Sequence, residues 1–150
     1  MKRVILYASV LFMAVCSISC SNQGNKKEVA KVISSSKVNV YYFHFTRRCA
    51  TCMAVEQTAR QAVEVLYPNE VKAGEYSFTS LNLDEAGTKE IADQLGVGGQ
   101  SLMVVHGDKK IDITGAAWMA AHDPEKMKSE IKSGIDKVLF ELYGVFKKFT

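Results

Sequence analysis

The stretch Arg47-Arg48-Cys49-Ala50-Thr51-Cys52 decides how the rest of the chain is interpreted. It follows residues 38–45, which are mostly β-branched and aromatic as in a strand that is covered on both faces, and it precedes a helix-like pattern that extends to about Leu66. Two cysteines three positions apart in the first turn of a helix lie on the same face. Their thiols are therefore close enough to form a disulfide or to share a soft metal ion.

The overall composition predicts a single globular domain. The chain has 150 residues, of which 47% are hydrophobic and 23% are charged, which is enough for one core and leaves no room for a second domain. The net charge of +3 comes from 19 Lys and Arg against 16 Asp and Glu, and two of these cations, Lys2 and Arg3, belong to a leader. This near balance argues against nucleic acid as a partner.

Residues 1–19 have the features of an export signal. A basic start is followed by an apolar segment, 4–14, that is short for a membrane-spanning helix. The small residues that end in Cys20 resemble the lipobox of bacterial lipoproteins, although Ser17 stands where that motif usually has Leu or Val. The resemblance implies that Cys20 carries a lipid anchor and that the domain faces the periplasm. An uncleaved signal anchor and an ordinary cleaved signal are the alternatives.

This leader simplifies the cysteine count. Cys16 would be lost with the leader and Cys20 would carry lipid, so that the mature domain keeps only Cys49 and Cys52. Residues 20–37 are polar and predict a tether, and the domain occupies 38–150. In an oxidising cell envelope, such a cysteine pair is usually a disulfide or a thiol-exchange centre.

Strand and helix patterns alternate along the domain. A strand-helix-strand order predicts that the first two strands are parallel, and the short Gly107-Asp108 turn predicts an antiparallel hairpin. Asp123 and Pro124 predict the start of a long final helix that docks by one face. The expected elements are a strand at 38–45, a helix at 49–66 ended by Pro68 and 69–74, a strand at 76–83, a helix at 88–95, strands at 101–105 and 110–114, and a helix from 124.

This order of elements resembles the thioredoxin fold over residues 38–145. Gly96-Val97 and Gly115-Ala116 match thioredoxin positions before the third core strand and after the hairpin. The resemblance implies an α/β three-layer sandwich in which helices flank a central mixed four-stranded sheet. It also implies a redox-active disulfide between Cys49 and Cys52, with no separate cofactor.

Within this superfamily, the chain resembles the ArsF family of bacterial lipoproteins, described as "nitrophenyl compound nitroreductase subunit". The residues that carry this resemblance are 42–52, 82–84 and 100–102, together with the leader. It implies a role in handling nitroaromatic or arsenical compounds, with an integral membrane thiol reductase or another envelope thiol protein as partner. The sequence has no Gly-x-Gly-x-x-Gly after a strand, so direct nitroreduction would need a partner that bears a cofactor.

Two positions depart from the thioredoxin pattern. Ser101 occupies the position of the proline that is cis in thioredoxins, and a cis bond before a non-proline residue costs about 3 kcal/mol, so we expect a trans bond and a wider space beside the thiols. Phe43 occupies the position of the buried acid that assists the resolving cysteine, and strand alternation places His44 on the opposite face. The usual general base is therefore expected to be missing.

The residues around the cysteines predict their roles. The helix N-terminus and the positive charges of Arg47 and Arg48 favour a thiolate at Cys49, which we expect to be the attacking sulfur. Cys52, one turn further into the helix, is then the resolving sulfur. A short-ring disulfide would contribute little stability by loop entropy, which favours a redox or ligand-binding use over a static structural bond.

The sequence leaves several functions open. The first is an envelope thiol-disulfide redox protein, which would be a thiol-disulfide oxidoreductase if it is catalytic. The alternative is a binding module in which Cys49 and Cys52 capture arsenite, copper(I) or zinc, with His44, a dimer or an outside ligand completing the site. A subunit of a nitroreducing complex ranks third. His106 and His122 are predicted to be solvated, and Trp118 to serve in packing or to contact an aromatic substrate.

Overall fold

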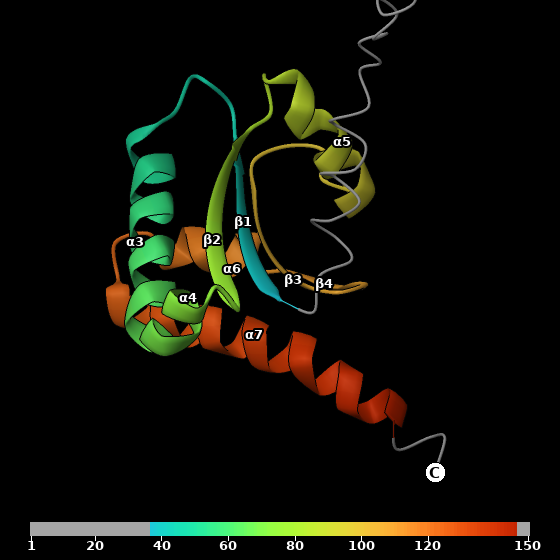
Figure 1. Cartoon of the computed structure of the whole chain (residues 1–150). Coiled ribbons are helices and arrows are strands. Elements are labelled where there is room, and N and C mark those ends of the chain that lie inside the picture. Colours follow the sequence, from blue (N-terminus) through green and yellow to red (C-terminus); the bar gives the residue numbers. More distant parts are fainter. Residues whose placement is uncertain (1–36, 147–150) are drawn as a thin grey trace, which may run out of the picture.

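The computed structural model describes residues 37–146, with side chains through Phe140. A four-stranded sheet lies at the centre, with α3 (Ala50–Leu66) on one side and α5 (Ala86–Leu95) on the other (Figure 1). The predicted leader, Cys20 and all of the tether except Lys37 lie outside the described residues. No helix in the described part of the chain is long and apolar enough to cross a membrane.

The elements follow the predicted order, with two short helices added. Pro68–Ala73 and Thr114–Met119 were not predicted to be helical. In chain order the elements are β1 (Val38–His44), α3, α4 (Pro68–Ala73), β2 (Tyr76–Asn82), α5, β3 (Ser101–His106), β4 (Lys109–Asp112), α6 (Thr114–Met119) and α7 (Pro124–Phe146).

The sheet has the strand order β2-β1-β3-β4. β1 and β2 are parallel, and β3 runs antiparallel to both β1 and β4. The predicted parallel pair and the predicted hairpin are therefore confirmed. Val38 pairs with Tyr76 at one end of β1, and Phe43 pairs with Ser101 near the other end.

β1 is buried on both faces, as its continuous apolar pattern predicts. Val38, Val40 and Tyr42 pack in the larger core cluster, which contains α3 and α7. Tyr41 and Phe43 pack in the smaller cluster with residues of α5 and β3. Alternation along one strand thus decides which side chains face the helix that carries the cysteines.

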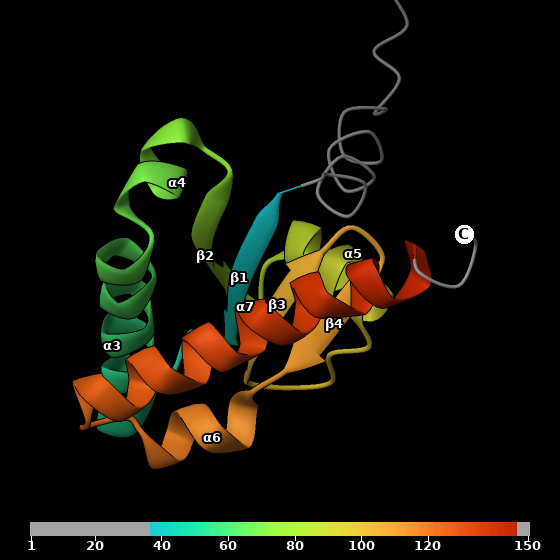
Figure 2. The ribbon, with the colours of Figure 1, turned by 90° about the horizontal axis from the view of Figure 1, so that it is seen from below.

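α7 docks on the sheet by the face that its periodicity predicts. Met127, Ile131, Ile135 and Val138 are almost completely buried. Asp123 begins the helix, since its carboxylate accepts a hydrogen bond of 3.0 Å from the main-chain nitrogen of Lys126. Figure 2 shows α7 crossing the sheet beside α3 and α6. Leu142, Val145 and Phe149, which continue the same three- and four-residue spacing, lie outside the described side chains.

The two unpredicted helices have local causes. Pro68 was interpreted as the end of the preceding helix, but proline is also favoured in the first turn of a new one, where its missing N–H costs nothing. Thr114 was assigned to the end of a strand. Its main-chain nitrogen instead donates a 2.8 Å hydrogen bond to the Asp112 carboxylate, and its hydroxyl accepts a 3.0 Å bond from the Leu102 nitrogen. These bonds accompany the change from strand to helix at Thr114.

Candidate active site

Cys49 and Cys52 form a disulfide at the N-terminus of α3, with their Cα atoms 5.1 Å apart. Cys49 is the N-cap residue, with an extended backbone, and its sulfur accepts a 3.1 Å hydrogen bond from the main-chain nitrogen of Cys52. The helix that was predicted to open at Cys49 therefore begins at the next residue. This geometry directs a helix N–H group at the Cys49 sulfur, which favours negative charge on it.

The two sulfur-bearing residues differ in exposure. Cys49 is exposed, whereas the exposed fraction of Cys52 is only 4%. An incoming thiol can therefore approach Cys49, while the protein covers Cys52. This is the asymmetry that an attacking and a resolving cysteine require, although the assignment of these roles stays a prediction.

The loop before Cys49 is tied to the end of β2. The main-chain nitrogen of Thr46 donates a 2.7 Å hydrogen bond to the Asp84 carboxylate, and the Asn82 amide donates a 3.0 Å bond to the Thr46 hydroxyl. The Leu83 nitrogen also donates to the His44 carbonyl oxygen at 2.7 Å. The bond from Thr46 holds the pKa of Asp84 below its usual value. These hydrogen bonds thus fix the start of the loop that leads to Cys49 against the end of β2.

The two predicted supporting arginines differ in their surroundings. Arg47 is exposed and has no ion-pair partner among the described residues. Arg48 forms an ion pair with Glu56, which lies one helical turn after Cys52, and Arg60 contacts the second oxygen of the same carboxylate at 3.3 Å. Arg60 also lies over the ring of Phe78, 4.6 Å from its centroid. The charge of Arg48 is therefore balanced inside the protein, whereas that of Arg47 is open to solvent.

Glu56 is held as an anion. Its partial burial would raise the pKa of the carboxyl group, but the hydrogen bonds and positive charge of Arg48, together with Arg60, keep the pKa below its usual value. Only 17% of the Glu56 side chain is exposed. A carboxylate is thus present on the helix that carries the disulfide, whereas the strand position that matches the thioredoxin acid is Phe43.

Tyr42, rather than Phe43, lies on the same face of the sheet as Cys52. The Tyr42 hydroxyl donates a 2.8 Å hydrogen bond to the Cys52 carbonyl oxygen, whereas Phe43 packs in the cluster on the α5 side. His44 does lie on the face opposite Phe43, but this is the face of Tyr42, whose ring is 5.7 Å from the His44 ring. The expectation that position 43 faces the resolving cysteine was wrong. The match to the thioredoxin pattern does not include how the loop 45–48 turns before α3.

A cavity of about 360 Å³ lies beside Cys52. Its other lining residues come from the loop before β3 and from α6: Gln100, Thr114, Gly115 and Trp118. Trp118, expected to serve in packing or in contact with a substrate, is half-buried, and its ring centroid lies 6.1 Å from that of Tyr42.

Ser101 does not line this cavity. It is buried beside Phe43 in the sheet and lines a different cavity of about 240 Å³ that includes Met103 and Asp112. The described residues contain no cis peptide bond, so the expected trans bond before Ser101 is confirmed. The structure thus brings Gln100 and Thr114 to Cys52, where the thioredoxin pattern had indicated Ser101.

The other candidate side chains lie apart from the disulfide or have other partners. His44 is buried, and its Nδ1 atom lies 2.9 Å from the Phe45 carbonyl oxygen. His106 is half-buried at the end of β3, and His122 is exposed before α7. Across the described side chains, no group of three or more His, Cys, Asp or Glu is arranged to hold a metal ion. A soft ion bound by Cys49 and Cys52 would therefore need a further ligand from elsewhere.

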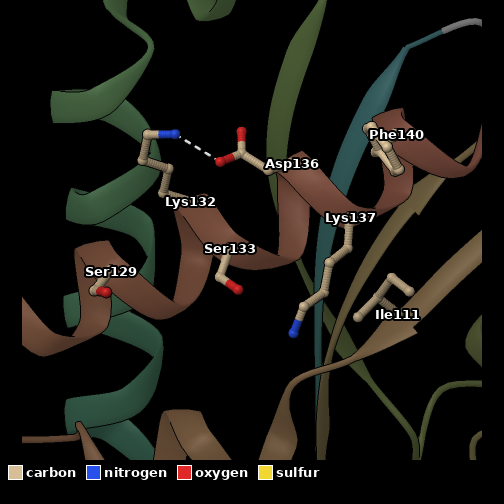
Figure 3. A pocket seen from close by; sticks show the side chains of 7 residues that line it. All are labelled: Ile111, Ser129, Lys132, Ser133, Asp136, Lys137 and Phe140. Carbon is tan, nitrogen blue, oxygen red and sulfur yellow. Dashed lines mark hydrogen bonds and ion pairs between the residues drawn. The ribbon is translucent and has the colours of Figure 1, made fainter. Parts of the chain in front are cut away.

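A cavity of about 690 Å³ lies on α7 and β4, and its lining residues include Ile111, Lys132, Lys137 and Phe140 (Figure 3). None of its lining residues lines the cavity beside Cys52. Figure 1 places α7 at the opposite end of the sheet from the loop that leads into α3. This second cavity is therefore not part of the disulfide site.

Sequence reasoning did not assign a role in the site to Tyr42, Glu56, Gln100 or Thr114. One signal was available for Glu56, because it lies four residues after Cys52 and therefore on the same helical face. Gln100 was noted only within the ArsF-like stretch 100–102, and no signal placed it or Thr114 beside Cys52, since their positions depend on how the strand β3 and the helix α6 meet α3 in space.

Comparison with known proteins supports the fold. No protein-family model matches the chain, and no curated protein matches it. Among solved structures, the chain is similar to thioredoxin O2 from Arabidopsis thaliana in its oxidized state, with a TM-score of 0.51 and 20% sequence identity over 72% of this chain and 84% of that chain. The chain therefore has a thioredoxin-like α/β fold, in which a mixed four-stranded sheet flanked by helices carries a Cys49-Cys52 disulfide.

Proposed function

We propose that this chain is a thiol-disulfide redox protein of the cell envelope, with Cys49 as the attacking sulfur and Cys52 as the resolving one. In the reducing direction, a thiolate of a partner dithiol attacks Cys49, forms a mixed disulfide and releases Cys52, which takes up a proton. The second thiol of the partner then attacks the partner's first sulfur, which is bonded to Cys49 in the mixed disulfide. This attack releases Cys49, which is also protonated. The partner dithiol loses two electrons and two protons, and the Cys49-Cys52 pair gains them.

The observation that supports this proposal best is the difference between the two cysteines. Cys49 is exposed at the N-cap of α3, and its sulfur accepts a hydrogen bond from the Cys52 nitrogen. Cys52 is buried one turn further along. A helix N-terminus stabilises the thiolate of Cys49, whether it attacks or leaves. Cys52 is covered by the protein, so it is suited to attack a mixed disulfide at the neighbouring Cys49 and not a sulfur in solution.

The location and partner belong to the same proposal. The lipobox-like sequence at Cys20 supports a lipid anchor, which would keep the domain at a membrane surface near an integral membrane thiol reductase or another envelope thiol protein. The ArsF-like residues 42–52 support a link to nitroaromatic or arsenical compounds, in which this chain would pass electrons and the partner would carry any cofactor.

A trapping experiment tests the exchange reaction. Cys52→Ser leaves Cys49 without its resolving thiol, so we expect the variant to accumulate mixed disulfides with envelope proteins, which mass spectrometry would identify. Cys49→Ser is the matched control and should trap none. The wild-type protein should also equilibrate with a dithiol buffer and give a measurable reduction potential. A Cys49-Cys52 bond that does not exchange with dithiols in the folded protein would overturn the proposal.

A further inference from the structure

We propose that the surface around Cys49 selects a partner polypeptide that has an acidic residue beside its reactive cysteine, with Arg47 as the residue that recognises the acid. The inference rests on the proposed exchange function and names the chemistry of the partner. It combines one open positive charge with a group of exposed apolar side chains, both close in sequence or in space to the disulfide.

The charges near the disulfide leave Arg47 as the cation available to a partner. Arg47 is exposed, lies two residues before Cys49 and has no ion-pair partner in the described part of the chain. Its neighbour Arg48 is bound to Glu56. Arg60, whose side chain is 42% exposed, shares that carboxylate and lies over the ring of Phe78. The exchange site therefore presents the guanidinium of Arg47 to an approaching molecule.

Both carboxylates of this region, Glu56 and Asp84, have partners within the protein. Glu56 is mostly buried between Arg48 and Arg60. Asp84 is exposed, but one of its oxygen atoms accepts the 2.7 Å hydrogen bond from the Thr46 nitrogen that ties down the loop. His44, the remaining titratable side chain at the end of β1, faces Tyr42 and is buried. The N-terminus of α3 adds positive potential at Cys49 itself. Asp84 keeps its negative charge, so the preference for an anion rests on Arg47 and on the helix N-terminus beside Cys49.

Exposed apolar side chains lie on the segments next to the disulfide and on α6, which packs against α3. Phe45 is 39% exposed in the loop before Cys49, Met53 is 53% exposed directly after Cys52, and Met119 is 75% exposed on α6 next to Trp118. α6 packs against α3, and Trp118 lines the cavity beside Cys52. Methionine side chains adapt to different apolar shapes, which suits a surface that docks a polypeptide. A small anion alone would leave this apolar surface uncovered.

Matched peptides test the proposal. Three dithiol peptides would share an apolar Cys-x-x-Cys core and differ only in one flanking residue, which is Glu, Gln or Lys. The rate at which each reduces the Cys49-Cys52 disulfide would be divided by its rate with an uncharged small disulfide, which corrects for the effect of the flanking charge on the peptide's own thiol. At low salt we expect the Glu peptide to react up to about fivefold faster than the Gln peptide, with the Lys peptide slowest.

Charge reversal provides the decisive comparison. Arg47→Glu should reverse the order of the three peptides, and a salt concentration of about 0.5 M should reduce the differences in the wild type. Lys137→Glu makes the same change in charge on α7, at the other end of the sheet, and should keep the wild-type order. Equal corrected rates for all three peptides, or an order that Arg47→Glu leaves unchanged, would overturn the inference while the exchange function stands. No reaction with any peptide would overturn both.

Discussion

The hydroxyl group of Tyr42 donates a hydrogen bond of 2.8 Å to the main-chain carbonyl oxygen of Cys52. This bond joins the central strand β1 directly to the first turn of α3. The Tyr42 side chain is completely buried, and the rings of His44 and Trp118 lie 5.7 and 6.1 Å from its ring centroid. A tyrosine thus joins the helix that carries the disulfide to the sheet. In the thioredoxin pattern, a buried acid lies near the resolving cysteine instead.

Tyr42→Phe should lower the free energy of unfolding of the oxidised protein by about 1 kcal/mol. The ring stays in place, so the loss reports the interactions of the hydroxyl group, which are its hydrogen bond to Cys52 and its interaction with Arg48. Urea unfolding measures it. Tyr41→Phe is the matched control, because Tyr41 is buried on the opposite face and has no hydrogen bond from its hydroxyl to another described residue. Equal losses in both variants would show that the bond to Cys52 contributes nothing specific.

Glu56→Gln should lower the pKa of the Cys49 thiol in the reduced protein. The substitution removes a negative charge that balances Arg48, so that the thiolate feels more of the arginine's positive charge. Arg48→Gln should shift the pKa in the opposite direction. The pH dependence of alkylation by iodoacetamide measures both shifts.

The control for this experiment is Glu64→Gln, which removes an exposed carboxylate near the far end of α3 and should leave the alkylation profile unchanged. A raised pKa of Cys49 in Glu56→Gln would contradict the prediction, because it would mean that Glu56 does not oppose the positive charge near the sulfur.

Acid should destabilise the protein partly through Glu56. Burial opposes ionisation, but Arg48 and Arg60 lower the pKa of Glu56 in the folded state below the ordinary value of 4.5. The unfolded chain therefore binds this proton first as the pH falls, so the stabilisation is complete above pH 4.5 and is lost as the pH falls through the folded-state pKa. Thermal unfolding at neutral pH and well below pH 4.5 should show a smaller loss of Tm in Glu56→Gln than in the wild type. An identical acid loss in the two proteins would refute this contribution.

Gly134→Ala should destabilise the protein although it improves the helix propensity of α7 by about 1 kcal/mol. A Cβ atom at Gly134 would lie 3.0 Å from a methyl group of Val104 and 3.2 Å from one of Ile113. Both neighbours are buried and β-branched, so relieving these contacts should cost about 1–3 kcal/mol. Chemical denaturation measures the net change, with Ser129→Ala on the exposed face of α7 as control. A more stable Gly134→Ala protein would show that the core yields at this point.

Local patterns in the sequence were sufficient for most of the architecture. The apolar run of β1, the helix that follows Cys49 and the anchors of α7 repeat with the period of their element, so their burial could be predicted without any distant contact. The short helices α4 and α6 were not predicted, because six residues carry too little periodicity to be distinguished from a turn.

The sequence by itself determined the order of strands and helices, the parallel pairing of β1 with β2, and the placement of the cysteines at a helix start, because these features depend on residues close together in the chain or on the chirality of short connections. Only the tertiary structure decided that Tyr42 and not Phe43 lies on the side of Cys52. It also decided that Arg48 pairs with Glu56 while Arg47 is exposed to solvent. Finally, it placed Gln100 and Thr114 at the cavity beside Cys52. These relationships depend on how an irregular loop sets the position of α3 against the strands, and no periodic pattern encodes that position.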